Sequence, residues 1–176
     1  MPYFLHVSRI GTDKDILTAL KAYKKFYQKT KSNKSLVFLG NGPLLEYYQK
    51  WVIDNGLEGK VFFLGNRSNP FVWMKNAQAL LLSSFNEGLP TVLIEGQICS
   101  TLVISSNCED GPDEILENGK SGVLFKVNDS DGLAGILIDY EKGLIDRENI
   151  IKNADESLYR FAKEEFKKQI YLSVLE

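Results

Sequence analysis

Short apolar runs alternate with longer amphipathic stretches along the chain. Six runs are almost continuously apolar and are predicted to be strands: 3–7, 36–39, 61–64, 79–82, 102–105 and 123–125. Strands of this kind are covered by other elements on both faces, whereas a strand with one solvent-exposed face alternates apolar and polar residues. The pattern therefore predicts a buried sheet.

The stretches between the runs favour helices. From Asp15 to Thr30 the apolar residues recur at helical steps of four, three and four: Ile16, Leu20, Tyr23 and Tyr27. A second helix is predicted from Pro43, which suits a first helical position, to about Asp54, with Asn55-Gly56 as its end. Residues 92–98 predict a buried helix, and helices dominate after residue 125.

Strands separated by helices imply right-handed parallel crossovers. The predicted fold is α/β: a Rossmann-like, doubly wound parallel sheet of about six strands with helices on both faces, in one domain over residues 1–176. Such sheets bind ligands at the carboxyl ends of their strands. The loops expected there are 8–14, 40–44, 65–69, 83–91 and 106–112.

Composition narrows the class of protein. The 176 residues suit one domain with a full core, and the formal net charge of −2 gives no electrostatic reason to expect nucleic acid as the main partner. No apolar run approaches the roughly 18 residues that span a bilayer, and the N-terminus lacks the pattern of a signal peptide. Cys99 and Cys108 match no metal or redox spacing and are expected to be reduced in a cytoplasmic protein.

The loop 83–91 leads from a strand into a helix and offers an anion site. Gly88 permits close approach of the backbone, Pro90 presets the helix entry, and the first amides of the helix suit a phosphate. Glu95 shares a helix face with Thr91 and suits a ribose diol, whereas Glu87 would lie on the sugar side of that phosphate. The alternative is that both glutamates are surface acids.

Arg9 and Lys14 follow the first strand, at the same predicted edge of the sheet. Two cations there suit a diphosphate, although a solvated pair near a helix start is the alternative. A further lysine-rich surface is predicted to be solvated, with contact to an anionic membrane as the alternative: Lys21, Lys24, Lys25, Lys29, Lys31 and Lys34.

Three other features carry less weight. Residues 40–43 resemble the start of Gly-x-Gly-x-x-Gly, but Leu45 stands at the third position. Residues 119–121 resemble the end of a P-loop, which is rejected because Glu114 stands where that motif needs glycine. His6, the one histidine, is predicted to be a packed strand residue rather than a catalytic base.

The segment from Glu87 to Glu95 resembles the Glu-x7-Glu motif of glycosyltransferase family 4, which has the GT-B fold. The resemblance covers essentially the whole chain. Further segments carry it in order: His6-Val-Ser-Arg9 with Lys14, Phe38–Leu44, Phe62–Pro70 and Gly111–Ile115. Several ordered motifs are more specific than any one of them.

The resemblance implies roles for individual residues. Arg9 and Lys14 would hold the donor diphosphate, Glu95 the ribose, and Glu87 the sugar hydroxyls; Arg9, Lys14 and Glu87 form the catalytic set. Glu87 would not be a nucleophile. The remaining donor-binding residues are Gly42, Asn66, Arg67, Gly88, Leu89, Pro90, Thr91 and Val92, with the last two contributing amides and Asn66 and Arg67 flanking the base.

The resemblance also implies a reaction. It is retaining, needs no metal or other cofactor, and transfers a hexose or N-acetylhexosamine, with a UDP-sugar favoured, in bacterial-type polysaccharide or glycolipid synthesis. The chain corresponds to the C-terminal, donor-binding half, so the N-terminal acceptor-binding domain is expected to be absent and the isolated domain inactive. The full enzyme is expected to be cytoplasmic, with peripheral membrane contact as an option.

One departure and two alternatives remain open. The family has Gly-Thr-Pro-Val after the motif helix, whereas this chain has Ser100-Thr-Leu-Val103, which puts the tight turn in question but not the donor site. One alternative is another nucleotide-binding α/β domain, a dinucleotide-dependent oxidoreductase or sugar-nucleotide epimerase. The other is a non-catalytic interaction module, against which the intact set of Arg9, Lys14, Glu87 and Glu95 argues.

Overall fold

The computed structural model describes residues 1–109, 111–161 and 163–175; residue 110 of the predicted loop 106–112 lies outside them. Its sheet has six parallel strands in the order β3-β2-β1-β4-β5-β6, which confirms the predicted fold. The strands are β1 (Tyr3–Val7), β2 (Ser35–Leu39), β3 (Val61–Phe63), β4 (Ala79–Leu82), β5 (Val103–Ser106) and β6 (Val123–Phe125).

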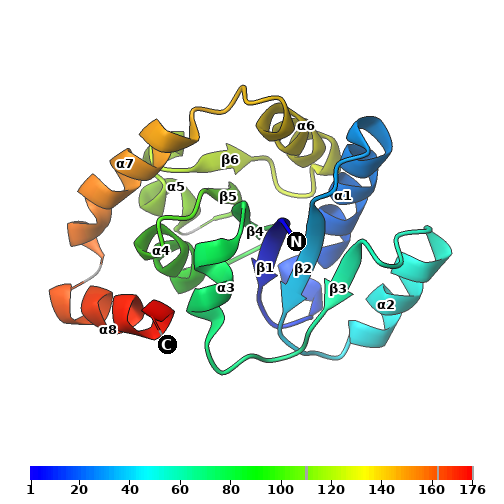
Figure 1. Cartoon of the computed structure of the whole chain (residues 1–176), viewed down its shortest axis with the longest axis horizontal. Coiled ribbons are helices and arrows are strands. Elements are labelled where there is room, and N and C mark those ends of the chain that lie inside the picture. Colours follow the sequence, from blue (N-terminus) through cyan, green and yellow to red (C-terminus); the bar gives the residue numbers. More distant parts are fainter. Residues whose placement is uncertain (110, 162, 176) are drawn as a thin grey trace.

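Helices cover both faces of the sheet (Figure 1). The helical elements are η1 (Thr12–Lys14), α1 (Ile16–Thr30), α2 (Leu45–Asp54), α3 (Pro70–Asn76), α4 (Thr91–Ile98), α5 (Pro112–Ile115), η2 (Glu117–Gly119), α6 (Ser130–Glu141), α7 (Arg147–Ser157), η3 (Leu158–Arg160) and α8 (Glu164–Leu175). Helices α1, α2 and α6 pack on one face, and α3, α4 and α8 on the other.

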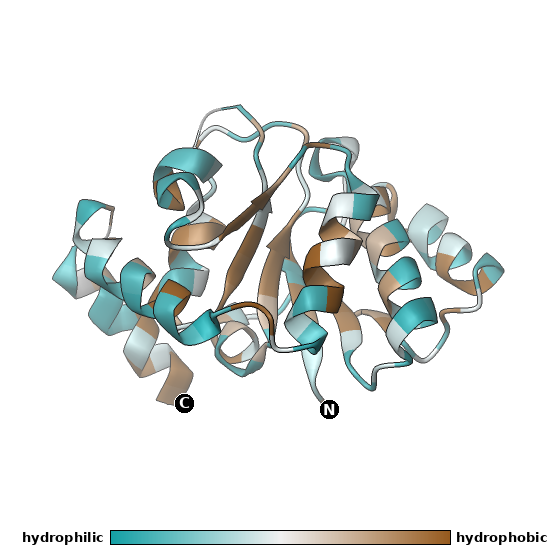
Figure 2. Ribbon diagram, turned by 90° about the horizontal axis from the view of Figure 1, so that it is seen from above, coloured by the Kyte–Doolittle hydropathy of each residue, from teal (hydrophilic) through white to brown (hydrophobic). Residues whose placement is uncertain are grey.

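Alternate residues of the strands supply two separate cores. In β1, Phe4 belongs to the core under α1 and α6, whereas Tyr3 and Leu5 belong to the core under α3 and α4. This alternation follows from the two-residue period of a strand, and both faces are buried because the sheet is doubly wound. Figure 2 shows that the strands are hydrophobic, whereas the helices around them carry both hydrophobic and hydrophilic residues. His6 is fully buried in β1, as predicted.

The predicted strand bounds are close to those observed. The bounds of β1, β4 and β6 match, and β5 lies one residue further along the chain than predicted. β2 begins at Ser35, whose amide donates to the carbonyl of Pro2 (3.0 Å). β3 ends at Phe63, although the Leu64 amide still donates to Phe38 (3.0 Å).

Two helices differ from the sequence prediction. Helix α2 begins at Leu45 rather than at Pro43: residues 43 and 44 form a turn, in which the Leu44 amide donates to the carbonyl of Ile10 (3.3 Å). Helix α3 was not predicted, although its start carries two ordinary signals. Pro70 occupies its first turn, and the Asn69 side chain accepts a hydrogen bond from the helix amide of Phe71.

The turn after α4 forms without the family's glycine and proline. Ser100 adopts the left-handed conformation (φ 53°), and the Thr101 amide donates to the carbonyl of Gly96 (3.0 Å). The Thr101 hydroxyl is buried and donates to the carbonyl of Met74 (2.7 Å). A serine therefore takes a conformation that glycine adopts more readily.

Two lysines of the predicted lysine-rich surface form ion pairs within the protein. Lys25 pairs with Asp131 and Lys34 with Glu141, both acids of α6, at 2.7 Å each. These ion pairs favour the interpretation of the lysines as a solvated surface. Contact of the lysines with an anionic membrane stays a prediction. Among the helices that the structure describes, none combines the length and the hydrophobicity that a transmembrane span requires.

Candidate functional site

The carboxyl ends of β1 and β4 lie side by side where the strand order reverses. From β1 the chain builds β2 and β3 on one side, and β4 then joins the other side of β1. In a doubly wound sheet this switch point opens a crevice between the loops that follow the two strands. Those loops are residues 8–14 and 83–91, so the two segments with predicted functional residues meet at one edge.

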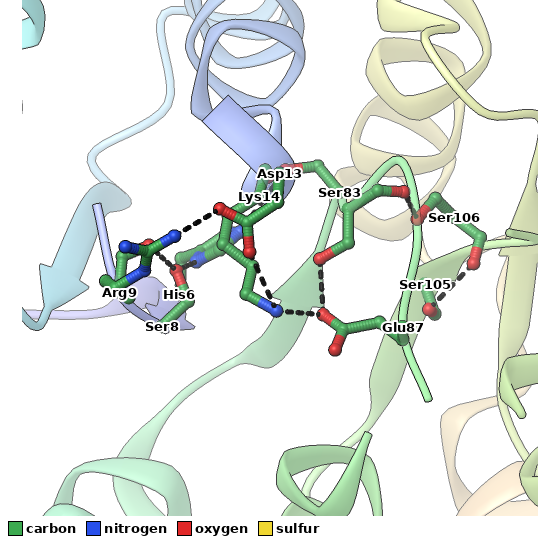
Figure 3. A network of polar contacts seen from close by, with 10 residues as sticks. His6, Ser8, Arg9, Asp13, Lys14, Ser83, Glu87, Ser105 and Ser106 are labelled. Carbon is green, nitrogen blue, oxygen red and sulfur yellow. Dashed lines mark hydrogen bonds and ion pairs between the residues drawn. The ribbon is translucent and has the colours of Figure 1, made fainter. Parts of the chain in front are cut away.

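The ammonium group of Lys14 reaches across the crevice to Glu87 (Figure 3). Nζ lies 2.8 Å from Oε1 of Glu87 and 3.5 Å from Oδ2 of Asp13. The Lys14 and Glu87 side chains are only 19% and 12% exposed, so their attraction is less screened than in a surface pair. The Ser84 hydroxyl donates to the same Oε1. Both contacts use Oε1, so within the described residues Oε2 is available to a ligand hydroxyl.

Arg9 and Lys14 are joined through Asp13, which the sequence prediction did not include. The Arg9 guanidinium lies 3.0 Å from Oδ1 of Asp13 (Figure 3). Partial burial acts to raise the pKa of Asp13, but hydrogen bonds from its own amide and Arg9, with the charges of Lys14 and Arg9, hold that pKa below its usual value. An acid four residues after Arg9 and next to Lys14 was the signal available in the sequence.

Helix α4 points its first turn at the crevice. Pro90 is the cap residue and has no N–H, and the Thr91 amide donates to the carbonyl of Leu89 (2.8 Å). The described part of the chain provides no backbone partner for the Val92 amide. A Cβ on Gly88 would meet nothing within 4 Å, so the loop is open at that point. The predicted use of the Thr91 amide for phosphate thus requires it to leave Leu89.

Glu95 lies one turn further along α4, on the same face as Thr91, as predicted. Its carboxyl is half-buried, and burial raises its pKa, while a hydrogen bond from the Thr91 side chain partly opposes that rise. A carboxylate in this position gains from hydroxyl donors, because each hydrogen bond replaces lost hydration.

Two neighbouring cavities contain most of the predicted residues. One, of about 190 Å³, is lined by Lys14, Glu87 and residues 89–92, which lead into α4. The other, of about 430 Å³, is lined by Arg9, Asn66, Arg67 and residues 39–41. Both include Val7 and Ser8, so they adjoin at the end of β1. Gly42, Gly88 and Glu95 line neither cavity.

The packing of the backbone around residue 42 requires a glycine whether or not a ligand binds. A Cβ there would lie 2.2 Å from the carbonyl oxygen of Ile10, which is a rigid backbone contact. The amide of Ile10 donates to the carbonyl of Asn41 (2.9 Å), so the loops after β1 and β2 are tied together at this point. Contact of Gly42 with a donor stays a prediction.

A larger and more open depression, of about 990 Å³, lies away from this crevice. It is lined by Ser100, residues 143–148 and the start of α7. Ser100 precedes β5, so the depression is at the amino edge of the sheet. Its side chains mix both charges and include none of the predicted site residues. The side chains suited to binding a diphosphate and a sugar therefore lie in the switch-point crevice and not in this depression.

Within the described ranges, no group of three His, Cys, Asp or Glu side chains is arranged to hold a metal ion. The expected independence of metal stays a prediction.

Curated relatives resemble this chain over much of its length. An N-acetyl-D-galactosaminyltransferase of Campylobacter jejuni that acts on a diphospho-undecaprenol-linked saccharide is 32% identical over 130 residues, which are 74% of this chain and 36% of that protein. The N-acetyl-α-D-glucosaminyl L-malate synthase of Bacillus anthracis is 28% identical over 175 residues, 97% of this chain and 45% of that protein. The chain thus spans less than half the length of these relatives.

Solved structures share the fold. The Staphylococcus aureus protein TarM, in a complex with UDP among other ligands, superposes with a TM-score of 0.85 at 20% identity, over 99% of this chain and 35% of its own. The C-terminal domain of a group 1 glycosyl transferase from Francisella tularensis gives a TM-score of 0.80 at 20% identity, over 93% and 89% of the two chains. These likenesses support the predicted Rossmann-like half of a GT-B fold.

The family assignment comes from the sequence itself. Residues 1–157 match the family described as glycosyl transferases group 1, and this stretch includes every strand of the sheet and both loops of the crevice. The match agrees with the order of the motifs from His6 to Ile115. The chain belongs to the glycosyl transferases group 1 family.

Proposed function

We propose that this domain binds the nucleotide-sugar donor of a retaining, metal-independent glycosyltransferase, and that the donor is a UDP-sugar. One observation supports the proposal above others: Arg9, Lys14 and Glu87 converge with the start of α4 at the switch point. Cations and helix amides stabilise a diphosphate leaving group, and carboxylates accept hydrogen bonds from sugar hydroxyls. The UDP complexes of the fold neighbours add support for the nucleotide.

The roles divide along the donor. Arg9 and Lys14 bind the diphosphate, and the amide of Val92 contributes with that of Thr91 once the latter leaves Leu89. Glu95 binds the ribose, and Asn66 and Arg67 flank the base in the 430 Å³ cavity. Glu87 binds the sugar. These assignments place the reacting bond near Lys14, in the smaller cavity.

The acceptor belongs to a second domain in this proposal. The relatives are longer than this chain; two are transferases named for diphospho-undecaprenol-linked saccharides, and one is a synthase of N-acetyl-α-D-glucosaminyl L-malate. We expect the isolated domain to bind donor but to transfer no sugar until an N-terminal acceptor-binding domain is supplied. A hexose or N-acetylhexosamine is the expected sugar.

The first experiment is calorimetry with UDP, GDP, ADP and NAD. We expect UDP to bind most tightly and, at a hundred times its dissociation constant, to stabilise the fold by about 2.7 kcal/mol. Chelation of metal ions should leave its affinity unchanged. K14Q should weaken binding strongly, whereas K50Q, at an exposed lysine on α2, is the matched control. Binding of NAD in preference to every nucleoside diphosphate would favour a dinucleotide domain, and no binding at all would contradict the proposal.

Two further variants test the separate roles proposed for the carboxylates of Glu95 and Glu87. E95A should lose more affinity for UDP than for 2′-deoxy-UDP, because only the ribose with its 2′-hydroxyl can use both hydrogen bonds. E87A should lose more affinity for a UDP-sugar than for UDP. Equal losses for each pair of ligands would remove the corresponding glutamate from its assigned role.

A further inference from the structure

His6 lies within β1, directly beneath the crevice, and both of its ring nitrogens have serine partners. The side chain is fully buried, with its ring 5.3 Å from that of Phe38. Nε2 lies 3.2 Å from the hydroxyl of Ser83, which follows β4, and Nδ1 lies 3.3 Å from the hydroxyl of Ser8, which follows β1. The imidazole therefore links the two loops that form the site.

The Ser83 hydroxyl extends this link to Lys14. Its oxygen lies 3.0 Å from the carbonyl of Lys14 and 2.9 Å from that of Asp15, and it is the donor to both. A hydroxyl has one hydrogen, which Ser83 shares between these two carbonyls, and its oxygen then accepts from the ring of His6. This arrangement assigns the proton of the neutral ring to Nε2, and Nδ1 accepts from the hydroxyl of Ser8, which then turns away from the Arg9 carbonyl that lies 3.1 Å from it.

The ring stays neutral under all ordinary conditions. Burial, aided by the positive charge of Lys14, lowers the pKa of His6 to about 3. A neutral ring with one fixed donor and one fixed acceptor is suited to holding geometry and not to exchanging protons with a substrate.

We propose that His6 is a positioning residue of the donor site, which acts through Ser83 to hold the main chain of Lys14 opposite Glu87. The idea rests on the proposed donor binding and adds a residue outside the ligand's reach. Within the described residues, the one other tie between these two loop backbones is the bond from the Phe85 amide to the Asp13 carbonyl (2.9 Å). Without His6, the Ser83 hydroxyl keeps its two carbonyl partners but loses the ring nitrogen that fixes its orientation toward the main chain of Lys14.

The test replaces His6 by glutamine or asparagine, whose amides can imitate the ring at Nε2 or at Nδ1, respectively. In H6Q the longer side chain can place an amide donor near the position of Nε2 and keep the bond to Ser83. In H6N the shorter side chain reaches only the position of Nδ1, so Ser83 loses its partner. We expect H6N to weaken UDP binding about tenfold, the equivalent of roughly one buried hydrogen bond, and H6Q to restore most of the affinity.

A double-mutant cycle distinguishes positioning from general loosening of the fold. If His6 acts through Lys14, H6N should have no further effect on UDP affinity in the K14Q background. S83A should reproduce the loss and should not add to that of H6N, which provides a second route if H6N folds poorly. Nitrogen-15 NMR of the wild type should find the proton of His6 on Nε2.

Three results would overturn the inference: UDP affinity unchanged in both H6N and S83A, an equal H6N penalty with and without Lys14, or a proton on Nδ1. A wild-type domain that binds no UDP while retaining the Nε2 tautomer would instead overturn the proposed function, and the positioning role with it. K50Q again controls for nonspecific effects of substitution.

Discussion

Buried neutral His6 makes the stability of the domain depend on pH in a calculable way. In the unfolded chain its pKa is near 6.5, whereas in the folded chain burial and Lys14 lower it to about 3. Below pH 6.5 the unfolded chain therefore binds a proton that the folded chain does not bind. Stability is unaffected above pH 7 and falls as the pH drops from 6.5 towards 3.

The magnitude follows from these two pKa values. Between pH 7 and pH 5, proton uptake by the unfolded state lowers the free energy of unfolding by about 2 kcal/mol. For a domain of this size that is a decrease of roughly 4–8 °C in Tm. Since the chain has a single histidine, no second imidazole contributes over this interval.

The assay is urea unfolding, followed by the fluorescence of the two tryptophans, at pH 7 and pH 5 for wild type and H6Q. Burial raises the pKa of Asp15 and Glu95, which acts in the opposite sense but equally in both proteins. The wild type should lose about 2 kcal/mol more than H6Q. Equal losses in the two proteins would refute the reasoning, because His6 would then titrate alike in both states.

Three other predictions concern the backbone and the thiols. S100G should stabilise the fold by up to about 1 kcal/mol in urea unfolding, because relief of the left-handed conformation of Ser100 exceeds the entropy cost of a glycine; a loss would mean that the serine side chain has a structural role. G42A should destabilise by roughly 1–3 kcal/mol through its clash with the Ile10 carbonyl, whereas G88A, in open space, should leave unfolding unchanged; similar effects of the two would contradict the loop packing. Cys99, whose thiol pKa burial raises to about 12, should resist a disulfide reagent in the native protein and react in urea; rapid native reaction would show that the site opens.

Much of the fold could be predicted because each element carries a local signal. The apolar runs locate the strands, since a run of residues such as Leu81 is stable only where it is buried, as it is in the covered sheet. Helix α3 is too short to show a helical period, and its Asn69-Pro70 start is equally typical of a loop. The order of the strands has no local signal, because it depends on which apolar runs pair across long separations.

The candidate site was predictable in its parts but not in its contacts. Arg9, Lys14 and Glu87 follow strand ends and could be identified by type and place. The ion pair between Lys14 and Glu87, and the bridging position of Asp13, arise only when β4 lies beside β1. For the same reason the sequence predicted His6 as a packed residue but could not reveal its two serine partners.

The central position of β1 ties the proposed donor binding to the course of folding. β1 is the earliest strand in the sequence, yet its second edge is closed only by β4, through pairs such as Phe4 with Ala79. Contacts across such separations form slowly, because the loop between them must be ordered first. A chain that has completed only its first three strands has no crevice, since half of the walls are still unformed. A fluorescent nucleotide added during refolding would therefore report the late joining of the two halves of the sheet in real time.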